Sequence, residues 1–287
     1  MVCRRWRKAT CARSTRMRWR APMYDEPHRW LQAVENRIQY VEKRLRGASP
    51  VVGLPYKDGA VLFTVCPHGQ QKLYEVYDRL ALGGLGHPAD VERLRMMAIN
   101  LAHTEGFARS AADVTLQRLL NFAIAPQVKT SFDEVFRSPV IAKFLMVELA
   151  HAGEDTRFFT LNFDGNFSSR DTFGIAAGTH QAEELMASRL ADHPPASDAL
   201  DDVLQAALMV WAVGHCVDSN STQYDDPPMP SDEEVAAKLR EAAAKLEFEA
   251  AVLDRATASR AKFRALEAED IASLHTLIGE LPGGDET

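Results

Sequence analysis

The side chains of this sequence that could carry out chemistry are scattered. Its four cysteines form no Cys-x-x-Cys pair, which is typical of reduced thiols and not of a disulfide framework or a zinc site: Cys3, Cys11, Cys66 and Cys216. The histidines show no metal-ligand spacing either: His68, His87, His103 and His151. The acidic residues 232–234 suit a helix N-terminus and lack the alternating oxygen ligands of a calcium loop. We therefore expect no metal and no cofactor.

The most informative stretch is 49–86, which begins with Ser49-Pro50 and contains Lys72. Asp58-Gly59 is a turn signal between two strand-like runs. The expected strands in this stretch are 51–54, 60–65, 72–76 and 80–85.

The rest of the chain alternates between helical and strand-like blocks. Helices are expected at 88–107, 113–123 (capped by Asp113 and interrupted by Pro126), 181–192, 197–215, 231–245 and 268–278. Further strands are expected at 140–150, 158–163, 172–177 and 246–254, and a surface linker at 217–231. This order predicts an α/β (α+β) fold with four αββα layers, in which two stacked antiparallel sheets lie between helix pairs.

Composition excludes several classes of protein. With 287 residues and 46% hydrophobic content, the chain can form one large domain. A net charge of -7 argues against nucleic acid as the main partner. The sequence contains no apolar run near the roughly 18 residues that span a bilayer, so no membrane association is expected.

Three stretches together resemble one family. They are 49–86, LNFDGNF…GIAAGT at 161–179, and FEAAVLDR…AKFRALEAEDIASLHTLI at 248–278. Their order over roughly 27–278 is similar to that of bacterial α-type proteasome core subunits, of the N-terminal-nucleophile hydrolase superfamily. The resemblance implies a cytoplasmic subunit that is not itself an enzyme. Seven copies would form an outer ring on catalytic β-type subunits, gate the entry of protein substrates and dock an AAA+ unfoldase ATPase.

The resemblance also allows the catalytic positions to be compared. A catalytic subunit uses the free amine of its first Thr as the base for its own hydroxyl. Ser49 aligns with that nucleophile but is internal, and Val65 aligns with the supporting acid. Lys72 alone matches the supporting Lys, so no catalytic residue is expected. In α-type subunits this Lys lines the pocket for the ATPase C-terminal carboxylate. Lys72 with Gly84 and Gly86, which would admit the partner's backbone, is the expected docking pocket.

The segment 23–47 is expected to hold the pore gate and a ring helix. Apolar residues recur at helical spacing: Trp30, Val34, Ile38 and Val41. The resemblance implies that this helix packs on neighbouring subunits and that Tyr24-Asp25 lies at the pore mouth. The structural alternative is an amphipathic helix that covers its own domain. The single αββα domain is then expected at 48–280, followed by a disordered tail at 281–287.

Several alternatives remain open at this point. Residues 1–22 are basic and are interpreted as a disordered tail, which is either a reading frame started too early or a targeting or nucleic-acid arm. The chain could also be a divergent peptidase subunit that is active after processing before Ser49, or a homo-oligomeric ring protein without a proteolytic partner.

Overall fold

The computed structural model describes residues 26–134, 137–150, 156–220 and 227–281. Tyr24 and Asp25, the predicted pore-gate residues, lie outside this range, as do the tails 1–22 and 282–287.

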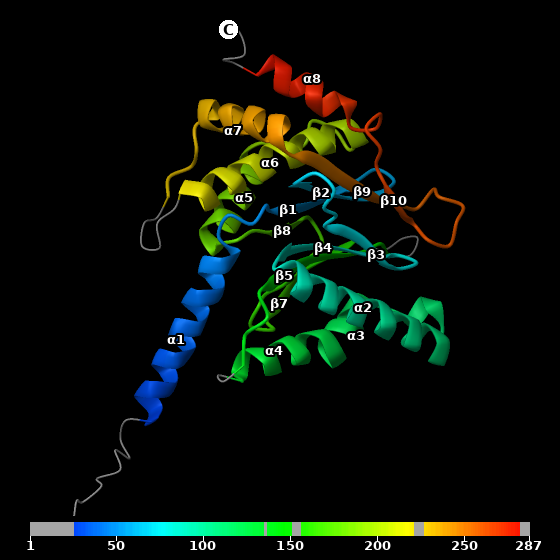
Figure 1. The fold of residues 1–287 in the computed structure, drawn as a ribbon. Helices are drawn as coiled ribbons and strands as arrows, with labels where there is room; N and C mark the ends of the chain where they lie inside the picture. Colours follow the sequence, from blue (N-terminus) through cyan, green and yellow to red (C-terminus); the bar gives the residue numbers. More distant parts are fainter. Residues whose placement is uncertain (1–25, 135–136, 151–155, 221–226, 282–287) are drawn as a thin grey trace, which may run out of the picture.

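Two five-stranded antiparallel sheets form the middle of the molecule (Figure 1). The first has the strand order β10-β9-β2-β1-β8 and contains β1 (Val51–Tyr56), β2 (Gly59–Cys66), β8 (Gly174–Ala176), β9 (Glu247–Asp254) and β10 (Phe263–Ala265). The second has the order β3-β4-β5-β6-β7 and contains β3 (Leu73–Tyr77), β4 (Leu80–Gly86), β5 (Ala142–Glu148), β6 (Arg157–Leu161) and β7 (Phe167–Arg170). The predicted hairpin turn at Asp58-Gly59 joins β1 and β2, with Tyr56 opposite Gly59.

Helices cover the outer face of each sheet (Figure 1). The first sheet is covered by α5 (His180–Asp192), α6 (Leu200–Asn220), α7 (Asp232–Lys245) and α8 (Ala272–Glu280). The second is covered by α2 (Pro88–Ala108), η1 (Ala111–Asp113), α3 (Leu116–Leu119), the π-helical turn η2 (Leu120–Ile124) and α4 (Ala125–Asp133). The predicted four-layer αββα fold is thus confirmed.

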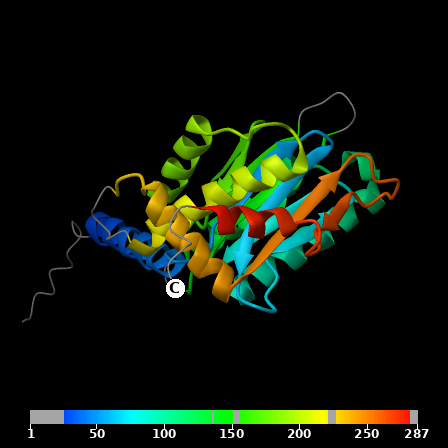
Figure 2. The ribbon, with the colours of Figure 1, turned by 90° about the horizontal axis from the view of Figure 1, so that it is seen from above.

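The long helix α1 (Glu26–Leu45) projects from the end of the sandwich opposite the β9–β10 hairpin (Figure 2). Only its C-terminal part enters the protein. Val41 and Leu45 are fully buried and pack in the apolar core between the two sheets, with residues such as Leu62 and Leu145. Arg37 anchors the middle of α1 to the second helix layer, because its Nη2 donates to the carbonyl of Ser131 at 2.8 Å.

Helix α6 is the central helix of the outer core over the first sheet. Residues Leu200–Asp218 are long and apolar enough to cross a membrane by length and composition, but 61% of that stretch is buried inside the protein. Trp211 in its middle is fully buried. The apolar character of α6 is therefore explained by core packing.

The structure differs from the sequence predictions at several element ends. Helix α6 continues to Asn220, four residues into the predicted linker 217–231, because Val217 and Asp218 are buried. Asp113 belongs to η1, and the helix cap is Thr115, whose hydroxyl accepts the Arg118 N–H. The irregularity expected at Pro126 takes the form of the π turn just before it. Strands β7 and β10 are additional to those predicted.

Candidate functional site

Ser49 lies two residues before the start of β1, and its hydroxyl is hydrogen-bonded within the protein. The Trp211 indole N–H donates to Ser49 Oγ at 2.9 Å, and Thr64 Oγ1 lies 3.4 Å from the same atom. An indole N–H is only a donor and a threonine hydroxyl is not a base. Neither partner can therefore take the proton that a nucleophilic serine must lose.

The next residue after Ser49 is held in the same way. The Thr64 hydroxyl donates to the carbonyl of Pro50 at 2.7 Å, and both residues are buried. Trp211 also stacks on His215, with ring centroids 4.9 Å apart. Burial lowers the pKa of His215 to about 4, so this imidazole is neutral at pH 7 and a weak base.

Strand β2 turns alternate residues toward Ser49. Thr64 faces Pro50 and Ser49, whereas Val65 packs with Phe63 in the core under α5 and α6. Because successive side chains of a strand point to opposite faces, Val65 is turned away from Ser49 and Lys72. The residues of β2 on the Ser49 side are thus Thr64 and Cys66, and neither is a carboxylate.

Lys72 reaches the Ser49 backbone. Its ammonium lies 3.4 Å from the Ser49 carbonyl oxygen, and its side chain is largely buried. Burial lowers the pKa of Lys72 to about 8, against the opposing effects of Cys66 and Glu249. The Glu249 carboxylate accepts the backbone N–H groups of Lys72 and Leu73, each at 2.9 Å, and so fixes the start of β3.

Cys66 is a structural thiol. Burial, followed by the charge of Glu249, raises its pKa to about 12, so the reactive thiolate is absent at neutral pH. Its Sγ donates to the Gln70 carbonyl at 3.0 Å. The same Sγ also lies 3.6 Å from Glu249 Oε2, and that contact keeps the thiol protonated.

We refer to Ser49, Thr64, Cys66, Lys72 and Glu249 as the Ser49 cluster. The hydrogen bonds given for the Ser49 hydroxyl in this cluster join it to Trp211 and Thr64, and neither of these side chains is a base.

Gly84 and Gly86 are required by packing within the chain. A Cβ on Gly84 would lie 2.7 Å from a Val91 methyl group, so this glycine lets α2 approach the sheet. Gly86 has a φ of 125°, and a Cβ there would lie 2.2 Å from the Ile141 carbonyl oxygen. Gly84 also donates its N–H to the Lys72 carbonyl at 3.0 Å, which places it beside the predicted docking Lys.

The predicted ring-helix residues divide into two groups. Val41 is buried in this chain's own core, and Val34 and Ile38 are partly buried. Trp30 is 51% exposed. Leu31 and Tyr40, which the sequence analysis did not single out, are 57% and 50% exposed. Helix α1 therefore presents large unburied apolar side chains along its projecting part.

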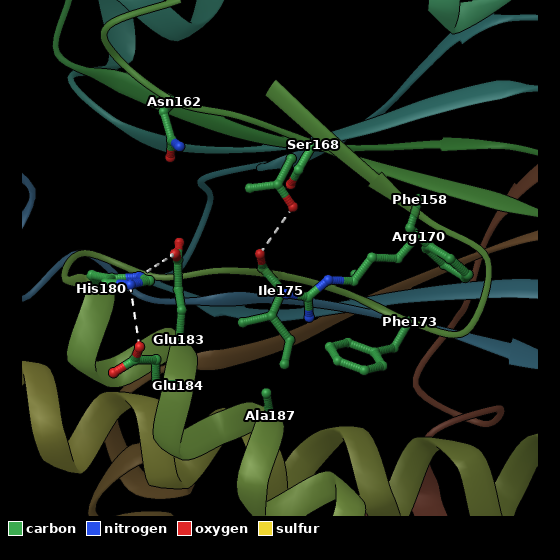
Figure 3. A pocket seen from close by; sticks show the side chains of 12 residues that line it. Phe158, Asn162, Ser168, Arg170, Phe173, Ile175, His180, Glu183, Glu184 and Ala187 are labelled. Carbon is green, nitrogen blue, oxygen red and sulfur yellow. Dashed lines mark hydrogen bonds and ion pairs between the residues drawn. The ribbon is translucent and has the colours of Figure 1, made fainter. Parts of the chain in front are cut away.

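A cavity of about 550 Å³ opens where β7 and β8 form the edges of their sheets (Figure 3). His180 lies 3.2 Å from Glu184 and 3.8 Å from Glu183 on one side. Arg170 stacks on Phe173 on another side, 4.9 Å from the ring centroid. Glu183 is already paired with the buried ammonium of Lys143 at 2.6 Å, so this carboxylate serves the fold. Nothing in the sequence pattern indicated this cavity, because its lining comes from four elements.

Among the described residues, none of the groupings of His, Cys, Asp and Glu could hold a metal ion.

The fold has the features that the resemblance implies. Two stacked antiparallel sheets lie between helix layers, and an additional helix precedes β1. Ser49, the position that aligns with the nucleophile, lies within the chain, between α1 and β1. This arrangement is an α+β sandwich of the proteasome α type.

Comparison with known proteins leads to the same class. The chain is 26% identical over 260 residues to a proteasome subunit alpha of Nocardioides, covering 90% of this chain and 89% of that protein. It is 28% identical over 254 residues to the subunit of Actinosynnema mirum, covering 88% and 87%. It is 29% identical over 195 residues to that of Mycobacterium tuberculosis, covering 67% and 77%. No family model matches the chain. The resemblance to bacterial α-type proteasome subunits is thereby confirmed.

Proposed function

We propose that this chain is a non-catalytic α-ring subunit of a cytoplasmic proteasome core particle. In this role seven copies form an outer ring on catalytic β-type subunits. The ring admits unfolded protein substrates, and the β subunits degrade them. The observation that carries the proposal is that Ser49 is neither a free N-terminus nor hydrogen-bonded to a base. Its chain continues into the packed end of α1, and its hydroxyl receives the Trp211 N–H.

The projecting part of α1 supports ring formation. Trp30, Leu31 and Tyr40 are about half exposed in the single chain. Exposed large apolar side chains on one element are typical of a protein interface. The partner in the proposal is a second copy of this chain, so α1 lies between neighbours in the ring. Tyr24 and Asp25 precede α1 directly and would line the pore that the ring surrounds.

Lys72 supports docking of an AAA+ unfoldase ATPase. With a pKa of about 8, most of its ammonium remains charged at pH 7. A largely buried ammonium attracts a carboxylate more strongly than an exposed one does, because water screens it less. The C-terminal carboxylate of an ATPase is the proposed ligand. Gly84 and Gly86 were expected to admit the partner's backbone, but the space beside them is taken by Val91 and the Ile141 carbonyl of this chain. Their part in the proposal is to keep β4 closely packed beside Lys72.

Co-expression with a β-type subunit from the same genome tests the proposal. We expect a four-ring particle on electron microscopy, with this chain in the outer rings and a mass that includes α1. Peptide hydrolysis should depend on the β subunit alone. A free N-terminus at Ser49 with hydrolysis by this chain alone would instead support an active subunit. A ring that never associates with β subunits would support a homo-oligomeric shell.

A further inference from the structure

A buried carboxylate ties the end of α6 to the start of α5. Asp218 is 1% exposed. Its Oδ2 accepts the Gly178 N–H at 2.8 Å, and its Oδ1 accepts the Thr179 hydroxyl at 2.6 Å. Thr179 is also the N-cap of α5, because its Oγ1 accepts the Ala182 N–H. Asp218 therefore fixes the segment that leads from β8 into α5.

The end of α1 rests on the same segment. A Cβ on Gly178 would lie 2.4 Å from the Leu45 carbonyl oxygen and 2.8 Å from Asp218 Oδ2. The Gly178 backbone thus lies in close contact with both the last residue of α1 and the Asp218 carboxylate. We refer to Leu45, Gly178, Thr179 and Asp218 as the α1 seat. Because the Leu45 carbonyl and the Asp218 carboxylate both lie against Gly178, lifting α1 from the seat would open this side of the buried carboxylate to water.

The charge on Asp218 is poorly compensated. Burial raises its pKa from 3.8 to about 6, although the Thr179 and Gly178 hydrogen bonds oppose that rise. The charged groups that act on Asp218 are Lys143 of β5 and Glu183 of α5. They pair with each other at 2.6 Å, and Lys143 also donates to the Ala177 carbonyl at 3.1 Å. The Lys143 ammonium is therefore shared and only partly offsets the cost of burying Asp218.

We propose that the α1 seat is sensitive to protonation: the buried negative charge of Asp218 loosens the seating of α1 at neutral pH, and neutralising that charge tightens it. A carboxyl group in water has its ordinary pKa, so the seated form binds the proton more tightly than the lifted form does. Seating of α1 therefore gains stability as the pH falls through about 6, and loses that gain as the pH rises again. At neutral pH, α1 is therefore held in the seat less tightly than at pH 5.

Hydrogen exchange of the Val41–Leu45 amides tests this directly, after correction for the intrinsic effect of pH on exchange. In the wild type we expect protection to rise about tenfold between about pH 7.5 and about pH 5, a change of about 1.4 kcal/mol. Asp218→Asn keeps the shape of the side chain without the charge. It should show high protection at both pH values and no dependence on pH. The matched control is Asp192→Asn, an exposed carboxylate at the end of α5, which should behave like the wild type.

A second pair of variants tests the contact between α1 and Gly178 without any change of charge. Gly178→Ala should abolish protection of Val41–Leu45 at every pH while leaving exchange in β2 unchanged. Gly279→Ala, where an added Cβ meets nothing within 4 Å, is the control. Equal pH dependence in the wild type and Asp218→Asn would overturn the proposal. Unchanged protection in Gly178→Ala would show that α1 does not rest on the seat.

Discussion

The Ser49 cluster and the α1 seat each bury a side chain that is charged at neutral pH, and burial shifts the pKa of Lys72 and of Asp218 in opposite directions. It lowers the pKa of Lys72 to about 8 and raises the pKa of Asp218 to about 6. Both groups are mainly charged at neutral pH, and burying each charge costs free energy of folding. In both regions the buried polar side chain holds a neighbouring stretch of backbone in place. Lys72 holds the Ser49 backbone and Asp218 holds the start of α5.

The two regions differ in what covers them. Trp211 and core side chains enclose Ser49 from within the domain, whereas the α1 seat is covered by a helix that projects out of the domain. The Ser49 cluster is therefore expected to be rigid. The α1 seat is expected to move together with the helix in the proposed ring.

The largest effect is expected for Trp211→Ala. It removes a fully buried indole and the hydrogen bond to Ser49 Oγ, and large-to-small changes of this kind cost about 3–5 kcal/mol. Urea unfolding of the isolated chain measures the loss. Trp211→Phe keeps most of the volume and should cost about 1–2 kcal/mol, mainly for the missing indole donor. A loss below about 1 kcal/mol for Trp211→Ala would show that Ser49 is not held as described.

The pH dependence of stability in Lys72→Met should distinguish the Ser49 cluster from the α1 seat. A lowered pKa means that the folded state binds the Lys72 proton less tightly than the unfolded state does. Wild-type stability should therefore rise, relative to Lys72→Met, by on the order of 1 kcal/mol between about pH 8 and about pH 10. The α1 seat responds at lower pH and with the opposite sign.

The control for this comparison is Lys57→Met, since Lys57 is an exposed lysine and its removal should leave the pH profile unchanged. In an assembled particle, Lys72→Met should also reduce ATPase-stimulated degradation while hydrolysis of small peptides continues. An intact ATPase response would remove Lys72 from the docking role.

The smallest effect is expected at Cys66. With its pKa raised to about 12 and a side chain that is 2% exposed, the thiol should resist iodoacetamide in the folded chain. Mass spectrometry of the Cys66 peptide should show alkylation at least about tenfold slower than in urea. Rapid labelling of the folded protein would mean that the Ser49 cluster is open to solvent, and the contrast with the α1 seat would fail.

Much of the fold could be predicted because the strands of 49–86 are apolar runs separated by clear turns. The strands that were missed are short and exposed. Three of the four residues of β7 are exposed, and β10 has only three residues, so neither shows a hydrophobic period. The end of α6, Val217-Asp218-Ser219-Asn220, has three polar residues of four, and its sequence therefore favours a linker. Asp218 belongs to the helix because it accepts donors from 40 and 39 residues away in sequence.

The site was predictable only in part, because some of its residues meet only through contacts between distant parts of the sequence. Ser49 and Lys72 could be found because they stand at strand ends in one continuous segment. Trp211 and Glu249 could not, since they approach Ser49 and Lys72 across separations of 162 and 177 residues. In the sequence, nothing distinguishes Trp211 from an ordinary apolar helix residue or Glu249 from an ordinary strand carboxylate. The role of each follows from tertiary contacts alone.

The most direct test of a non-catalytic α subunit uses a co-assembled particle whose β-type partner has its N-terminal nucleophile replaced by Ala. The measurement is peptide hydrolysis by that particle, together with the intact mass of this chain. The account predicts no hydrolysis above the buffer rate and a chain in which Ser49 remains joined to α1. Residual hydrolysis that disappears on Ser49→Ala, with a chain cleaved before Ser49, would contradict it.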